Sequence, residues 1–301
     1  MADTQDRPAA LEQDAAEEIV SALYRGVLKR EPEPSWMRRH AGQLKAKGIR
    51  AGLPELIGHF MGGATGLTDL ANALLVNSSR VYLRNVNEAF GKQMPPGSKL
   101  LDVGAGNSPY RNLFGHVQYE SADISRVKTE HGETTYVCDI CERIPVPDDH
   151  FDYLLFNQTL EHVKEPARAL DELFRVLRPG GTLLTTVPLF YEEHLVPYDF
   201  YRYTQFAHRY LFEKSGFRIE KIDWLEGFFG TCGYMLETIY RYAPSSTPGS
   251  GEEALWARSF LAVIKPLCLI GAGSFYRLDL TWKITNVGFP KNYVITARKP
   301  G

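Results

Sequence analysis

The hydrophobic and polar positions of this chain follow two different patterns. Between 17 and 60, apolar residues recur at helical spacing, interrupted by a proline-rich EPEP stretch. This pattern predicts a small helical unit over 1–66, whose first residues are disordered. The sequence GGATG at its end predicts a hinge, and 68–91 predicts a helix that leads into a second domain over 67–301.

Beyond this helix, short apolar runs rich in β-branched and aromatic residues alternate with helical segments such as PARALDELFRVLRPGG. Such alternation is typical of an α/β fold with a doubly wound, mostly parallel sheet, which binds its ligand at the carboxyl ends of the strands. An apolar insertion over 228–288 precedes the last run. The predicted strands are KLLDV (99–103), VQYESADI (117–124), TTYVCDI (134–140), FDYLLFN (151–157), GTLLTTVP (181–188), FRIEKIDW (217–224) and NYVITARK (292–299).

The turn after the first predicted strand, LLDVGAGNSPY (100–110), has two glycines but a proline where a dinucleotide fingerprint has its third glycine. Gly104 and Gly106 still permit a tight turn and a close approach of a ligand to the backbone. Asp123 ends the next strand, where its carboxylate can accept both hydroxyls of a ribose, and Asp139 ends the following one. The sequence thus has one acid that can bind a ribose and a second acid nearby, but it lacks the third glycine of a phosphate-binding turn. This combination favours a ligand in which an adenosine carries an amino acid.

Four segments then occur in order, namely LLDVGAGNSPY, YESADIS, VCDICERIPVPDDHFDYLLFNQTLEHV and ELFRVLRPGGTLLTTVP. In order and spacing they resemble the motifs of class I S-adenosylmethionine-dependent methyltransferases of the type 11-like group. The resemblance runs from about 80 to 227 and resumes at 292. It implies a Rossmann-like, seven-stranded, mostly parallel sheet and an enzyme that uses S-adenosylmethionine.

The resemblance also implies binding roles at the methionine end of the cofactor. Asp102, Gly104 and Gly106 would line this end, with Asp102 reaching the ammonium group directly or through water. Asn157, at the end of the fourth predicted strand, would offer its carbonyl to the same ammonium. For Asp102 and Asn157 the alternative is a purely structural role in turn and capping chemistry.

At the adenosine end the resemblance implies a second set of contacts. Asp123 would hold the ribose, and Asp139 would accept a hydrogen bond from the adenine amino group. Ile124 and Ile140 would sandwich the adenine ring.

The segment VPLFYEEHLVPYDFYRYTQF follows the fifth predicted strand and resembles a branch of these enzymes that is often encoded with glycan-assembly functions. Methyl transfer requires an aligned nucleophile and, for a hydroxyl, removal of its proton. His194 lies where the methyl must emerge and is the predicted base, with Asp199 the second candidate. Alternatively, His194 is a surface histidine and Asp199 pairs with Arg202. His162, after Glu161, is expected to shape the pocket.

The stretch YRGVLKREPEPSWMRRHAGQLKAKG resembles a short helical domain of unknown function in bacterial surface and glycan-related proteins. Tyr24, Arg25 and Trp36 belong to the matching pattern, but its usual acid and glycine after the proline are missing. The expected function is O-methylation of a small molecule or saccharide, in keeping with glycan biosynthesis. The alternatives are methylation of a lipid-linked or isoprenoid substrate, or a scaffold without catalysis.

Composition narrows the partners. A formal net charge of −2 gives no excess of positive charge for binding nucleic acid. The acidic N-terminus has no apolar stretch, which predicts a cytoplasmic protein. Cys138 and Cys141 form a CxxC, but no second pair lies at zinc spacing, so no metal is expected. Arg258 and Lys265 interrupt the apolar insertion, which predicts a lid or a homodimer contact rather than a membrane contact.

Overall fold

A computed structural model describes residues 75–125, 128–129, 132–244 and 252–301, together with Val20, Met37, Arg38, Ala41 and Gly42. The chain divides into two compact units. One comprises residues 1–76 and 233–276, and the other comprises 77–232 and 277–301. The predicted helical unit over 1–66 and its hinge lie outside the described residues, apart from the five single positions named above.

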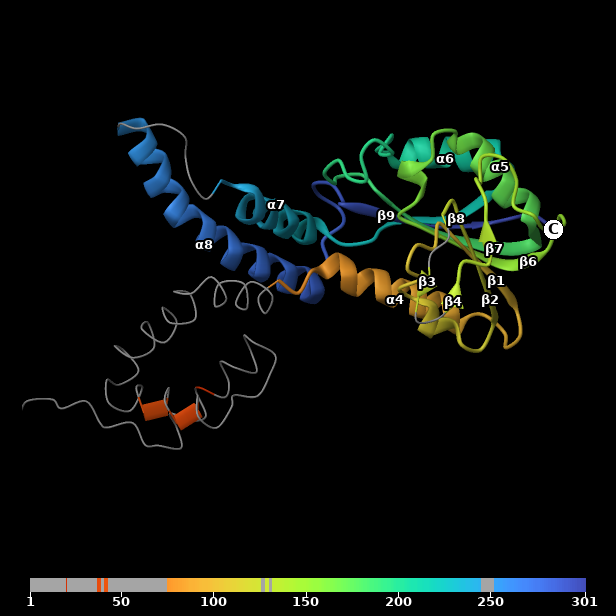
Figure 1. Ribbon diagram of the computed structural model, residues 1–301, viewed down its shortest axis with the longest axis horizontal. Coiled ribbons are helices and arrows are strands. Elements are labelled where there is room, and N and C mark those ends of the chain that lie inside the picture. Colours follow the sequence, from red (N-terminus) through yellow and green to blue (C-terminus); the bar gives the residue numbers. More distant parts are fainter. Residues whose placement is uncertain are drawn as a thin grey trace, which may run out of the picture. The chain divides into compact units, whose positions relative to one another are not determined.

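The second unit contains a seven-stranded sheet with the order β5-β2-β1-β6-β7-β9-β8 (Figure 1). Strand β9 runs antiparallel to both β7 and β8, whereas the other neighbours pair in parallel. This is the predicted doubly wound, mostly parallel sheet. The strands are β1 (Lys99–Val103), β2 (Gln118–Asp123), β5 (Tyr136–Val137), β6 (Phe151–Asn157), β7 (Leu177–Pro188), β8 (Arg218–Trp224) and β9 (Asn292–Arg298).

Strand β5 is much shorter than the predicted run over 134–140. It lies at the sheet edge and pairs only with β2, and the pairing covers two residues. Beyond it, the Cys138 N–H donates to the Asp123 carbonyl, and Oδ1 of Asp139 accepts a hydrogen bond from the Cys141 N–H at 2.8 Å. Such an Asx turn bends the chain away from the sheet. A separate two-stranded pair, β3 (Lys128–Thr129) and β4 (Gly132–Glu133), lies between β2 and β5 in the chain.

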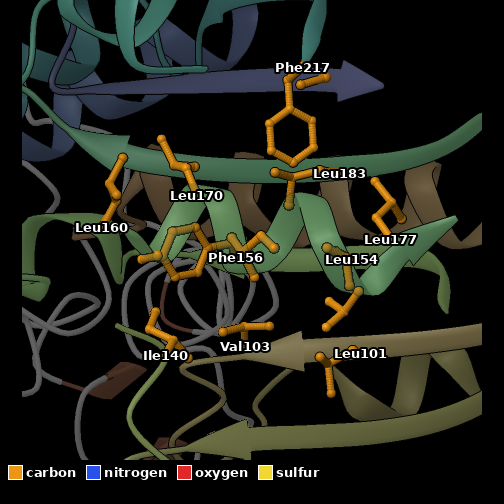
Figure 2. Close-up of a cluster of buried hydrophobic side chains, with 14 of the residues drawn as sticks. Leu101, Val103, Ile140, Leu154, Phe156, Leu160, Leu170, Leu177, Leu183 and Phe217 are labelled. Atoms are coloured by element: carbon orange, nitrogen blue, oxygen red, sulfur yellow. The ribbon is translucent and has the colours of Figure 1, made fainter. Parts of the chain in front are cut away.

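Helices cover both faces of the sheet. Helices α5 (Pro166–Val176) and α6 (Gln205–Lys214) lie on one face, and α4 (Ser78–Lys92) lies on the other (Figure 1). Alternation within the strands feeds both layers: in β1, Leu101 and Val103 join the α5 and α6 side, whereas Leu100 packs with Phe90 of α4 and with the 3-10 helix η2 (Arg111–Phe114). Figure 2 shows the first of these clusters.

The helices begin where the sequence supplies capping groups. Asn77 accepts a hydrogen bond from the Arg80 N–H at the start of α4, and Thr204 accepts one from the Ala207 N–H at the start of α6. Pro166 occupies the first turn of α5, where its missing N–H has no helical partner to lose.

The stretch predicted as an insertion folds into α7 (Phe228–Tyr242) and α8 (Glu252–Thr281), the latter with Pro266 inside it. Among the described residues, Leu255–Thr281 is long and apolar enough, by length and composition alone, to cross a membrane. Only 28% of its most apolar stretch is buried. The core helix of a soluble protein can have the same length and composition, so the predicted lid or homodimer contact stays a prediction.

Candidate active site

The glycine turn after β1 is built on two residues with positive φ, Gly104 at +67° and Gly106 at +49°. A Cβ atom on Gly104 would lie 2.3 Å from Cγ2 of Thr159, so this position requires glycine. A Cβ atom on Gly106 would meet no heavy atom within 4 Å. Gly104 is therefore packed against Thr159, whereas the space beside Gly106 is free.

Asp123 lies beside this free space, at the carboxyl end of β2. Its Oδ2 accepts a hydrogen bond from the Gly106 N–H at 3.0 Å. Its Oδ1 accepts hydrogen bonds from the N–H and the hydroxyl of Ser125 at 3.1 and 3.2 Å. The predicted ribose acid and the predicted glycine turn are thus brought together by the register of two neighbouring strands.

Asp102 is buried at the end of β1, with 7% of its surface exposed. One of its carboxylate oxygens accepts a hydrogen bond from the Tyr119 hydroxyl on β2. Burial raises the pKa of Asp102 to about 7, the charge of Asp123 adds to the rise, and the Tyr119 hydrogen bond opposes it. A neighbouring cation, such as an ammonium group, would favour the ionised carboxylate.

Asn157 ends β6 and is held by hydrogen bonds from three directions. Its side-chain Nδ2 donates to Oδ1 of Asn87 on α4 at 2.9 Å, and its Oδ1 accepts from the Thr186 hydroxyl on β7 at 3.0 Å. Its backbone carbonyl, the group predicted to face the cofactor's ammonium, accepts from the Thr159 hydroxyl at 2.9 Å. Sequence reasoning missed Asn87 and Thr159, because Asn87 contacts Asn157 and Thr159 packs against Gly104, and both contacts join distant parts of the chain.

The predicted adenine partners have different environments. Ile124 is 74% exposed, whereas Ile140 packs into the core with 9% of its surface exposed. Asp139 is exposed and closes its own turn with Cys141. Ile124 and Asp139 are thus accessible to a ligand, and the sandwich between Ile124 and Ile140 stays a prediction.

The residues at this end of the sheet fit S-adenosylmethionine. The free space at Gly106 admits a ligand against the backbone, and Asp123 lies at its edge. Asp102 supplies a buried acid on the adjacent strand β1, suited to an ammonium group.

A second group of side chains lies in the loop after β7. Nδ1 of His194 lies 3.2 Å from Oδ2 of Asp199 and 3.1 Å from the Glu192 carbonyl oxygen. Arg202 donates to both oxygens of Asp199, at 2.6 and 2.7 Å, and this pair holds the pKa of Asp199 well below its usual range. The structure thus brings together His194 and Asp199, and the Asp199–Arg202 pair also forms. Such an acid is better suited to orienting His194 than to accepting a proton.

His162, in the 3-10 helix η3 (Leu160–His162), completes this group. Its Nε2 lies 3.1 Å from Nε2 of His194, and its Nδ1 lies 2.7 Å from the Tyr198 carbonyl oxygen. Burial lowers the pKa of His162. Glu161 is fully buried, and neither of its carboxylate oxygens has a hydrogen-bond partner on another described residue.

The connection between β6 and η3 joins the two groups of residues. Thr159 packs against Gly104, and His162 follows three positions later. Tyr191 places its ring 5.0 Å from the His194 ring, and Tyr198 is exposed nearby in the same loop. Tyr203, in contrast, is buried in the core. Of these three tyrosines, therefore, Tyr198 is open to a ligand, Tyr191 is half-buried beside His194, and Tyr203 is inaccessible.

Comparison with known proteins agrees with this architecture. Residues 76–222 match the family model of a methyltransferase domain. This match and the seven-stranded fold support a class I S-adenosylmethionine-dependent methyltransferase. The predicted fold class, enzyme class and cofactor are therefore confirmed.

Its curated relatives include the ubiquinone/menaquinone biosynthesis C-methyltransferases UbiE. The chain is 31% identical over 159 residues to that of Psychromonas ingrahamii, which covers 52% of this chain and 51% of the relative. It is 30% identical over 133 residues to that of Vibrio parahaemolyticus, which covers 38% and 51%. The chain spans about half the length of these two relatives.

Among solved structures, phosphoethanolamine N-methyltransferase 2 of Haemonchus contortus, in complex with S-adenosyl-L-methionine, is similar with a TM-score of 0.43 and 18% identity. The match covers 81% of this chain and 60% of that chain.

Proposed function

We propose that this chain transfers a methyl group to a small-molecule acceptor that carries an ionisable hydroxyl on an apolar or aromatic skeleton. S-adenosylmethionine, when bound, supplies an electrophilic methyl group on a sulfonium. Asp102 and the Asn157 carbonyl would hold its ammonium, Asp123 its ribose, and Asp139 with Ile124 its adenine. The observation that carries the proposal is an acid-oriented histidine in the loop that follows β7, connected through η3 to the glycine turn.

His194 is the residue proposed to activate the acceptor. Its Nδ1 faces the Glu192 carbonyl, which can only accept a hydrogen bond, so Nδ1 carries the ring proton and Nε2 is left as the basic nitrogen. Asp199 and Arg202 act as positioning residues that fix the ring. Because an ionised phenol reacts at oxygen or at the adjacent ring carbon, one base serves both O- and C-methylation.

The surface next to the histidines supports an apolar acceptor. The loop after β7 exposes a series of large hydrophobic side chains: Phe190, Leu195, Val196, Tyr198, Phe200 and Tyr201. Ring and isoprenoid groups bury against such side chains through the hydrophobic effect. The names of the two UbiE relatives support the same class, a ring of the quinone type. A saccharide acceptor, expected from the glycan-related segment, is the second candidate, because tyrosines also stack on sugar rings.

An acceptor panel with isotopically labelled methyl donor tests this proposal. The panel contains demethylated quinols with short isoprenoid tails, simple phenols and saccharides, and mass spectrometry locates the transferred methyl. We expect labelled product from the ring compounds. Product from saccharides alone would overturn the acceptor class, and no binding of S-adenosylhomocysteine by calorimetry would favour a scaffold without catalysis.

Two variants separate acceptor activation from cofactor binding. A positioned base contributes about a hundredfold to ten-thousandfold, so His194→Ala should lower kcat by that factor and leave the affinity for S-adenosylhomocysteine unchanged. Asp123→Ala should do the reverse and weaken that affinity about tenfold to a hundredfold, because two hydroxyls lose a charged acceptor. Full turnover in His194→Ala would remove this residue from the mechanism.

A further inference from the structure

We propose that Glu161, His162 and His194 form a binding site for one divalent first-row transition-metal cation of the zinc type. One potential ligand atom from each residue lies within 4.8 Å of the other two. The three residues come from η3 and from the loop after β7, on either side of α5 in the sequence. The sequence predicts no metal, because no second cysteine or histidine pair lies at zinc spacing along the chain. The ligands of this site come from segments that are far apart in the sequence.

The distances suit a common cation. Zinc binds histidine nitrogen and carboxylate oxygen at about 2.0–2.2 Å, so two ligand atoms of one tetrahedral ion lie about 3.3–3.6 Å apart. The two Nε2 atoms are 3.1 Å apart, and Nε2 of His162 lies 3.7 Å from Oε1 of Glu161. A small shift of the Glu161 side chain completes the triangle.

The hydrogen bonds of both imidazoles leave lone pairs pointing at one another. Nδ1 of His162 faces the Tyr198 carbonyl oxygen, and Nδ1 of His194 faces the Glu192 carbonyl oxygen. Since a carbonyl only accepts hydrogen bonds, both ring protons belong on Nδ1, and both Nε2 atoms of the neutral rings are unprotonated. Two such nitrogens at 3.1 Å repel unless a proton or a metal cation lies between them.

Glu161 supplies an independent observation. Its side chain is completely buried, and neither carboxylate oxygen has a hydrogen-bond partner among the described residues. Burial of a carboxylate is costly unless the group is paired or coordinates a metal. A cation between the two histidines would compensate this buried acid.

Neighbouring groups orient both histidine rings in the way that is usual for metal ligands. In metal sites the second ring nitrogen of a histidine donates to a carbonyl or carboxylate, which orients the ring. Here Tyr198 and Asp199 take these positions. Arg202 fixes the loop through hydrogen bonds to the carbonyls of Tyr191 and Glu192.

A role for this site in catalysis rests on the proposed function. In that function the two histidines would hold the cation that activates the acceptor hydroxyl. Three protein ligands leave coordination positions for the oxygen of an acceptor hydroxyl. A cation held there would polarise that hydroxyl, so its proton would be lost to solvent and the resulting anion would be the nucleophile. His194 then serves as a ligand rather than as the base itself.

Metal binding is measured on the full chain without any methyl acceptor. The protein is treated with a chelator, dialysed and titrated with Zn²⁺ by calorimetry, and Co²⁺ provides a visible absorption spectrum. We expect one ion per chain with a micromolar or lower Kd. Glu161→Gln and His194→Ala should each weaken binding about a hundredfold or more, since even outer-shell partners contribute 10- to 100-fold. His116→Ala, at an exposed histidine elsewhere, should bind as the wild type does.

The outcomes distinguish this inference from the proposed function. Each variant is first checked for S-adenosylhomocysteine binding, which a folded protein retains. No stoichiometric binding of Zn²⁺ or Co²⁺ by the wild type would overturn the metal site and leave His194 as a base. Binding that survives in Glu161→Gln but is lost in Cys138→Ser would also overturn it, because the ion would then lie at the cysteine pair.

Discussion

Two glycines of one turn, both with positive φ, differ in their surroundings, and single substitutions can separate their roles. In Gly104→Ala the new methyl meets Thr159 at 2.3 Å, so we expect a marked loss of stability. In Gly106→Ala the methyl meets nothing within 4 Å, and the left-handed backbone costs only about 1–2 kcal/mol. This variant should fold but lose affinity for S-adenosylhomocysteine, because its methyl occupies the proposed ligand space. Thermal denaturation and calorimetry measure both effects, and equal stability of the two variants would contradict the argument.

A buried acid at the end of β1 makes cofactor binding depend on pH. The pKa of Asp102 is raised to about 7 by burial, so its carboxyl is largely protonated at pH 6 and ionised at pH 8. An ammonium group binds the ionised form, so the affinity for S-adenosylhomocysteine should rise about tenfold between these values and then level off. Asp102→Asn should remove this slope, whereas Asp139→Asn, at an exposed acid, should keep it. An unchanged slope in Asp102→Asn would assign the dependence to another group.

At the scale of elements, the sequence predicts the strands well, because β-branched and aromatic runs bounded by turn residues are local signals. It also assigns Gly106 and Asp123 to one ligand, and the parallel pairing of β1 and β2 brings these two residues together. It does not predict that His162 meets His194. These residues are separated by α5 and β7, and only the crossover connection brings their loops together. The short β5 is missed for a similar reason, since its end is set by the turn at Asp139.

The link between α4 and β6 is a second contact that no local pattern reveals. Asn87 is fully buried, donates to the Leu83 carbonyl at 2.7 Å and accepts from Asn157 at 2.9 Å. Asn87→Leu should leave the Asn157 amide buried without this partner, at a cost of about 1–3 kcal/mol in the free energy of unfolding. Urea denaturation measures this cost. An unchanged free energy of unfolding in Asn87→Leu would mean that this hydrogen bond does not contribute to stability.

At the scale of the whole molecule, one compact unit contains every residue of the candidate site. The site residues lie between Asp102 and Arg202, within the unit of 77–232 and 277–301. The carboxyl ends of β1, β2, β6 and β7 position them, and a common core beneath the sheet supports these strands. Stability of this core and integrity of the site are therefore coupled, and conditions that destabilise the core should weaken cofactor binding as well.

His208 makes that core sensitive to acid. Its ring on α6 is fully buried, packs 5.3 Å from the Tyr203 ring, and has no hydrogen-bond partner among the described residues for either nitrogen. Burial lowers the pKa of His208 to about 4, below its value of about 6.5 in the unfolded chain.

Because the pKa of His208 differs between the folded and the unfolded chain, the free energy of unfolding depends on pH. Above pH 6.5 the ring is neutral in both states, and below it the unfolded chain binds a proton that the folded core excludes. The free energy of unfolding should therefore fall as the pH drops toward 4, by about 2 kcal/mol at pH 5. His208→Phe should lack this component, so that its stability relative to the wild type rises by that amount between pH 7 and pH 5 in urea denaturation. His116→Gln, at an exposed histidine, should follow the wild type. Parallel pH profiles of His208→Phe and the wild type would show that His208 does not govern the acid response.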